Sequence, residues 1–134
     1  NTYPDLKFDG IICHSILEHT YDPFSAVKNL STVLKSNGIF LGFVPFLMEY
    51  HAPKDLKFQD FYRFSRDGIA YMFRDFEDVT IYPVRNQLST AISLLKKTKK
   101  YETKKGKEYI SAFLDWVKPG NSMQTTGFII YAIK

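Results

Sequence analysis

Polar side chains that could serve acid–base or ligand chemistry follow directly after a short apolar run. Phe8–Cys13 is rich in apolar residues, and His14, Ser15, Glu18 and His19 come shortly after it. A run of this kind is typical of a strand that is buried on both faces of a parallel sheet. Ligands of open α/β sheets bind outside the carboxyl ends of the strands. The sequence therefore predicts a ligand site where this strand ends.

A second candidate lies in the segment 46–64, which has neither helical nor strand periodicity. Long irregular segments after a parallel strand commonly form lids or walls that face the substrate. His51 is the best candidate for a general base in this segment, because imidazole side chains titrate near neutrality. A loop histidine with a purely structural hydrogen bond is the alternative. We predict His51 as catalytic.

Three more side chains of the same segment are candidates for substrate binding. Tyr50 and Tyr62, together with Phe46 and Phe58, could form an aromatic wall, or they could belong to the local core. Arg63 could hold an anionic acceptor through its planar guanidinium group. Its alternative use is an ion pair with Asp60 that fixes the segment. We predict Tyr50, Tyr62 and Arg63 as substrate-binding residues.

Helix and strand signals place these residues at one edge of a sheet. Asp22–Pro23 is a helix start, because Asp caps the first free amides and Pro fits the first helical position. An apolar face at helical spacing follows, and Asn37–Gly38 is the predicted helix end. Ile39–Pro45 reads as a second apolar strand. The sequence therefore predicts a βαβ unit with parallel strands and a right-handed crossover.

The second half of the chain carries further helix and strand signals around a basic tract. Ser65 begins a short predicted helix, and strands are predicted at Val79–Val84 and Phe128–Ile133. Residues 85–125 are predicted as a helical, Lys-rich insertion, with seven lysines and one glutamate in Lys96–Lys107. Such a tract is either a solvated loop or a surface for an acidic partner or an anionic membrane.

Length and composition indicate a single globular domain. The chain has 134 residues, of which 45% are hydrophobic and 24% charged, as expected for one packed core. Its net charge of +4 is concentrated in the Lys-rich tract, so we expect no nucleic-acid partner. The longest apolar stretch, Ile39–Met48, is too short to span a bilayer. The single cysteine favours a reducing, cytoplasmic location.

The first part of the chain resembles a known family. The run from Phe8-Asp9 through Leu17-Glu18-His19 to Asp22-Pro23, and then Leu34-Lys35 and Gly38, resembles the fourth strand, helix and fifth strand of class I S-adenosylmethionine-dependent methyltransferases. The resemblance implies an α/β, partial Rossmann-like methyltransferase fold. It would have parallel strands, helices on both faces and an antiparallel C-terminal strand, with residues 1–134 as the C-terminal part of one domain.

The same resemblance implies S-adenosylmethionine as cofactor, with Cys13, His14 and Ser15 lying along it near the sulfonium. The Gly-x-Gly-x-Gly turn that holds the methionine part in this family does not occur in the sequence. In the family, the strand that precedes this turn pairs beside the strand corresponding to Phe8–Cys13. We therefore expect a missing N-terminal half, or a second chain, to complete the sheet at that edge.

Glu18 and His19 have three alternative uses. They could fix the loop, His19 could accept a proton near the substrate, or both could belong to a divalent-metal site. The last use would follow from a resemblance to quinone-biosynthesis O-methyltransferases. Metal ligation normally needs three or more protein ligands, and only these two are evident in the sequence. We therefore predict His19 as catalytic and no metal.

The function that follows is methyl transfer to a small molecule with an oxygen or nitrogen nucleophile, carried out as part of a longer chain. The alternative is a non-catalytic methyltransferase-like domain that binds a partner through its open sheet edge or its basic tract. A dehydrogenase or hydrolase is a third class, but the Gly-x-Gly-x-x-Gly and Gly-x-Ser-x-Gly motifs of those enzymes do not occur in the sequence.

Overall fold

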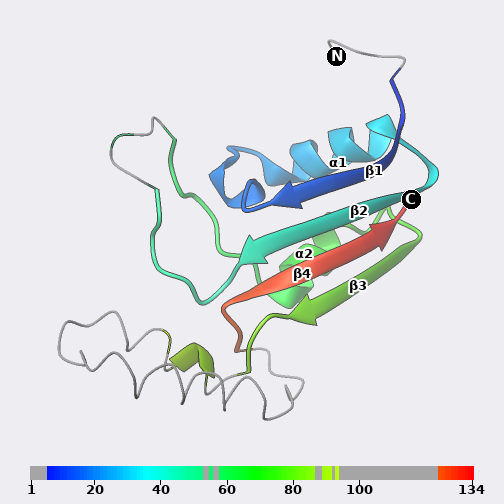
Figure 1. Cartoon of the computed structure of the whole chain (residues 1–134). Coiled ribbons are helices and arrows are strands. Elements are labelled where there is room, and N and C mark those ends of the chain that lie inside the picture. The colour runs from blue at the N-terminus through cyan, green and yellow to red at the C-terminus, as the bar shows by residue number, and fades with distance from the viewer. Residues whose placement is uncertain (1–5, 53–54, 56–57, 87–88, 92, 94–123) are drawn as a thin grey trace.

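Four strands form one mixed sheet in the computed structural model, which describes residues 6–52, 55, 58–86, 89–91, 93 and 124–134. The strands are β1 (Phe8–His14), β2 (Leu34–Pro45), β3 (Asp78–Pro83) and β4 (Gly127–Ile133). Their spatial order is β1-β2-β4-β3 (Figure 1). β1 and β2 are parallel, and β4 is antiparallel to both of its neighbours. The predicted α/β fold and the antiparallel C-terminal strand are confirmed.

The helices begin where side-chain caps are available. Helix α1 (Pro23–Val33) follows Asp22, whose carboxylate accepts a hydrogen bond from the amide of Ser25 at 3.0 Å. Helix α2 (Arg66–Met72) follows Ser65, whose hydroxyl accepts from the amide of Gly68 at 3.2 Å. In both helices the cap satisfies an amide that has no partner within the helix.

The end of α1 differs from the prediction. The helix ends at Val33 and β2 begins at the next residue, several residues before Asn37. Asn37 does adopt the left-handed conformation, with φ of 62°, but Gly38 does not. The Asn37 amide donates to the carbonyl of Lys134 at the end of β4, at 2.7 Å. Asn37 therefore lies in an irregular part of β2, where pairing to β4 outweighs continuation of the helix.

The core lies between the sheet and the two α-helices. Phe40 and Val44 of β2, Ile130 of β4, and Val27 and Ile69 of the helices are at most 1% exposed. Side chains of a strand alternate between its faces, so these strand residues define the helix-covered face. Figure 1 shows α2 behind the sheet on this side.

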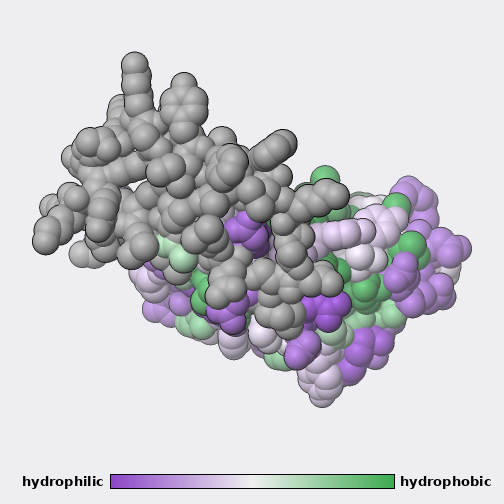
Figure 2. Space-filling model, turned by 90° about the horizontal axis from the view of Figure 1, so that it is seen from below, coloured by the Kyte–Doolittle hydropathy of each residue, from purple (hydrophilic) through white to green (hydrophobic). Residues whose placement is uncertain are grey.

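The opposite face of the sheet is uncovered by the residues that the structure describes. Ile12 is 79% exposed, and Ile39, Leu41 and Ile129 are each at least 40% exposed. Among the described residues β1 is an open edge strand, as expected if the rest of the domain lies outside this chain. The predicted burial of Phe8–Cys13 is met there only by Cys13. Figure 2, a view from below Figure 1, shows hydrophobic side chains interspersed with hydrophilic ones at the surface beyond the grey region.

Most of the predicted helical insertion 85–125, including its Lys-rich tract, lies outside the described residues. Within the part of the chain that is described, no helix has the length and apolar content needed to cross a lipid bilayer.

Candidate active site

The turn after β1 directs Glu18 into the protein. Ser15 has φ of 52°, a conformation that is uncommon for residues other than glycine, and its amide donates to the carbonyl of Phe43 at 3.1 Å. A single 3-10 turn, η1 (Leu17–His19), follows. Leu17 packs in the core at 1% exposure and Glu18 is fully buried. The chain reversal at Ser15 therefore places a carboxylate directly beneath the carboxyl edge of the sheet.

The segment after β2 folds back over this turn. The amide of Phe61 donates to the carbonyl of Glu18 at 2.8 Å, and the amide of Phe64 donates to the carbonyl of Pro45 at 2.9 Å. Both bonds join residues that are far apart in the sequence. They hold residues 61–64 against η1 and against the end of β2, and His51 of the same segment lies beside Glu18.

Glu18, His19 and His51 form the centre of the site. The Nε2 atom of His51 lies 3.5 Å from Oε1 of Glu18, and the Nε2 atom of His19 lies 3.8 Å from the same oxygen. The two imidazole rings meet edge to face, with their centroids 5.0 Å apart. The two histidines predicted as catalytic therefore lie side by side around one buried carboxylate.

Arg63 fixes the conformation of the segment. Its Nη1 and Nη2 atoms pair with the two carboxylate oxygens of Asp60, the Nη2 bond being 2.6 Å long. The remaining donors go to backbone carbonyls, those of Met48 (2.8 Å), Glu49 (2.6 Å) and Tyr62 (2.7 Å). All five N–H donors of the guanidinium are thus used within the chain. This geometry matches the ion pair that was left open as the alternative to substrate binding.

The ion pair also controls the charge of Asp60. Hydrogen bonding to Arg63 lowers the pKa of Asp60 from 3.8 to about 2, and the backbone amide of His51 adds to this by donating to the carboxylate. The same pairing raises the pKa of Arg63. Asp60 therefore stays ionised beside His51, whose Nδ1 lies 3.2 Å from Oδ2 of Asp60.

The residues predicted to bind the cofactor point in different directions. The Cys13 side chain is buried, and desolvation together with the charge of Glu18 raises the pKa of its thiol to about 11. His14 is exposed, and its ring stacks on Phe43 with the centroids 5.1 Å apart. Because neighbouring residues of a strand alternate, His14 lies on the uncovered face and Cys13 on the covered one.

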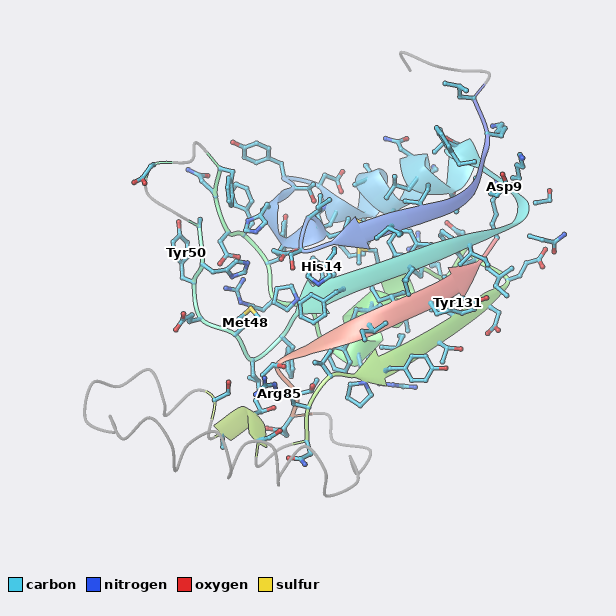
Figure 3. The ribbon with its side chains drawn as sticks, in the orientation of Figure 1. Asp9, His14, Met48, Tyr50, Arg85 and Tyr131 are labelled. Carbon is cyan, nitrogen blue, oxygen red and sulfur yellow. The ribbon has the colours of Figure 1, made fainter. Side chains whose placement is uncertain are left out.

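The aromatic residues of the segment divide into two groups. The hydroxyl of Tyr62 donates to the carbonyl of Tyr21 at 2.8 Å, and the ring packs against the core. Tyr50 is 67% exposed, and Figure 3 shows it at the same end of the sheet as His14 and Met48. Phe58, a member of the candidate aromatic wall that was not predicted as a site residue, lies edge to face on His19, with the centroids 4.7 Å apart.

A second partner of His19 was also missed. Its Nδ1 lies 2.7 Å from the backbone carbonyl of Gln59. A backbone acceptor leaves no signal in a sequence. The interleaved aromatic residues of the segment did indicate Phe58, but not the side chain on which it packs.

A family model described as a methyltransferase domain matches residues 2–42. No curated protein matches the chain. A SAM-dependent methyltransferase from Archaeoglobus fulgidus is 15% identical with a TM-score of 0.55, and the match covers 98% of this chain and 61% of that one. Phosphoethanolamine N-methyltransferase 2 from Haemonchus contortus, in complex with S-adenosyl-L-methionine, is 11% identical with a TM-score of 0.50. The match covers 94% of this chain and 33% of that one. The [4+2]-cyclase SpnF is 16% identical with a TM-score of 0.51, and the match covers 98% of this chain and 51% of that one.

These comparisons confirm the resemblance to class I S-adenosylmethionine-dependent methyltransferases. At such low identities, the structural likeness shows the fold. The chain spans between 33% and 61% of the length of these three structures.

Proposed function

We propose that this chain is part of an S-adenosylmethionine-dependent methyltransferase that acts on an oxygen or nitrogen nucleophile of a small molecule. The observation that carries the proposal is the position of the Glu18–His19–His51 cluster at the carboxyl edge of a methyltransferase-type sheet, next to the end of β1. In open α/β sheets this edge is where ligands bind. The family-model match over residues 2–42 supports the same activity.

In this proposal His14 and Ser15, with the backbone of Cys13, form one wall of the cofactor site. His14 and the half-exposed Ile16 offer flat and apolar surface at the end of β1, and the left-handed turn at Ser15 leaves this end accessible. These features fit one side of a nucleoside. S-adenosylmethionine would supply the methyl group on a sulfonium sulfur. Since the sequence has no Gly-x-Gly-x-Gly turn, the remaining contacts come from elsewhere.

The acceptor is proposed to lie over the histidine cluster. Methyl transfer needs the acceptor close to the donor and, for a hydroxyl, loss of its proton. His19 and His51 are the groups that we assign to this loss. Tyr50, exposed on the same segment, is assigned to the acceptor itself. Tyr62 and Arg63 act indirectly, because their hydrogen bonds hold the segment in place.

We further propose that a preceding N-terminal half or a second chain covers β1 and the uncovered face. β1 ends the sheet on one side, and it carries Ile12 at 79% exposure. Open apolar edges and faces promote aggregation unless they are covered. In the complete domain, Ile39, Leu41 and Ile129 would also become buried.

Calorimetric titration of the full-length protein with S-adenosylmethionine tests the proposal. We expect saturable binding, and His14→Ala should weaken it about tenfold because the exposed ring next to the cofactor is lost. Tyr82→Ala is the matched control: this exposed aromatic side chain lies on β3, at the opposite edge of the sheet. It should bind as the wild type does. Absence of heat with folded protein at millimolar cofactor would overturn the proposal.

A turnover assay then separates the rival functions. Formation of S-adenosylhomocysteine with small hydroxyl or amine acceptors is expected from the full-length protein, and negligible turnover from residues 1–134 alone. One structural neighbour is named a [4+2]-cyclase, so fold alone does not determine the reaction. Cofactor binding without transfer to any acceptor would favour a non-catalytic domain that binds a partner through its sheet edge or basic tract.

A further inference from the structure

The carboxylate of Glu18 is buried without hydrogen bonds. The residue is 0% exposed, and neither carboxylate oxygen has a hydrogen-bond partner among the described residues. A buried charge in this state costs several kcal/mol in ordinary proteins unless it is paired or binds a metal. The groups that face it are the Nε2 atoms of His51 and His19, at 3.5 and 3.8 Å.

Both histidines direct a lone pair toward this carboxylate. Nδ1 of His19 lies 2.7 Å from the carbonyl of Gln59, which can only accept, so Nδ1 carries the proton. Nδ1 of His51 lies 3.2 Å from both Oδ2 of Asp60 and the carbonyl of Glu49, which also only accept. The Nε2 atom of each neutral ring is therefore an acceptor, and two acceptors surround an unpaired anion.

Arg63 does not change this assignment. Its Nη2 atom is 3.5 Å from Nδ1 of His51, but both Nη2 hydrogens already go to Asp60 and the carbonyl of Glu49, at 2.6 Å each. Nδ1 of His51 is thus left to donate. A histidine that donates from one ring nitrogen to a carboxylate or a carbonyl, and presents the other nitrogen, has the usual arrangement of a metal ligand.

We infer that Glu18, His19 and His51 bind one divalent transition-metal ion of the zinc type. Their ligand atoms all lie within 4.8 Å of one another. A tetrahedral zinc ion with bonds of about 2.0–2.2 Å separates its ligands by about 3.3–3.6 Å. The two distances from Oε1 of Glu18 to the histidine Nε2 atoms, 3.5 and 3.8 Å, are close to this range. Two histidines and one carboxylate are a ligand set that leaves a further position open, as in catalytic zinc sites.

The third ligand, His51, lies on the segment that folds back over η1, and this is why the sequence alone indicated only two. The Asp60–Arg63 pair and the Gln59 carbonyl serve the site by orienting the two imidazoles. If the proposed methyl transfer holds, the open position takes the acceptor oxygen. His19 and His51 would then act on the acceptor proton through the ion that they bind, which promotes loss of this proton to water, and not by accepting it themselves. Metal binding itself does not rest on that reaction.

The test is titration of chelator-treated, full-length protein with Zn²⁺, followed by calorimetry and by metal analysis of the dialysed protein. We expect one ion per chain, a raised thermal midpoint, and weaker binding at acidic pH because protons compete for the ligands. Cobalt(II) should give the visible absorption of a tetrahedral site. S-adenosylmethionine binding, measured separately, keeps the outcome distinct from that of the proposed function.

Glu18→Gln and His51→Gln should each weaken zinc binding about 100-fold or more, since even loss of an outer partner costs about 10–100-fold. Glu18→Gln is expected to fold well, because it removes a buried charge and keeps the side-chain shape. His14→Gln is the matched control, a histidine outside the cluster, and should bind zinc as the wild type does. No saturable binding by folded protein, or wild-type affinity in both cluster variants, would overturn the inference and leave a metal-free histidine–carboxylate cluster.

Discussion

Oε1 of Glu18 lies 3.5 Å from Nε2 of His51, although the two residues belong to different segments that meet only through tertiary contacts. Glu18 is held by the turn that ends β1, and His51 by the segment that follows β2. The Phe61 amide, bonded to the Glu18 carbonyl, joins these segments. Changes that loosen the segment should therefore affect the site even when they do not touch it.

Arg63→Ala should destabilise the protein by about 2–3 kcal/mol, because it removes the guanidinium hydrogen bonds to the Asp60 carboxylate and to the carbonyls of Met48 and Glu49. Urea denaturation measures this change. Arg66→Ala is the control, since Arg66 is exposed at the start of α2, and should stay within about 0.5 kcal/mol of the wild type. Equal effects of the two substitutions would contradict the role given to Arg63.

The Asp60–Arg63 pair should give the stability a distinct acid dependence. The pKa of Asp60 is lowered from 3.8 to about 2 in the folded protein. The stabilisation of the folded state by the ionised Asp60 carboxylate is therefore complete above about pH 4 and is lost as the pH falls toward about 2. Urea unfolding at a series of pH values measures the difference in the free energy of unfolding between wild type and Asp60→Asn. This difference should become smaller as the pH falls over this range. A difference in the free energy of unfolding that does not change with pH would contradict the prediction.

Cys13 should be an unreactive thiol in the native protein. Its pKa is raised to about 11, so almost no thiolate exists near neutral pH, and the side chain is only 5% exposed. A colorimetric disulfide reagent should react slowly with folded protein and rapidly once denaturant is added. As Cys13 is the only cysteine of the 134 residues, Cys13→Ser should abolish the signal from this chain. Rapid reaction of this thiol in native protein near neutral pH would be the contrary result.

Phe40 and Leu41 report on the two faces of the sheet. Phe40→Ala should lower the free energy of unfolding by about 3–5 kcal/mol, because the ring is fully buried and packs on Phe73, directly after α2. Leu41 is 42% exposed on the uncovered face. If the rest of the domain covers this face, Leu41→Ala should cost about 2–3 kcal/mol in the full-length protein. A cost below about 0.5 kcal/mol would mean that the face stays open.

Local signals in the sequence were sufficient for most elements of the fold. Asp22 and Ser65 begin helices as predicted, because a side-chain cap acts within a few residues. The parallel pair β1 and β2 and the antiparallel β4 were also predicted, from apolar runs and from the family resemblance. The end of α1 was not, because pairing of Asn37 with Lys134 depends on a strand at the far end of the chain.

In the candidate site, too, local sequence signals predicted some features and tertiary contacts decided the others. The sequence by itself determined that Glu18 and His19 follow the end of a strand, and that His51 and Arg63 lie in an irregular segment after the next strand. Only the tertiary structure decided that His51 meets Glu18 and that every donor of Arg63 is used within the chain. The reason is physical: these contacts depend on backbone hydrogen bonds between segments distant in the sequence, and no local pattern of side chains encodes them.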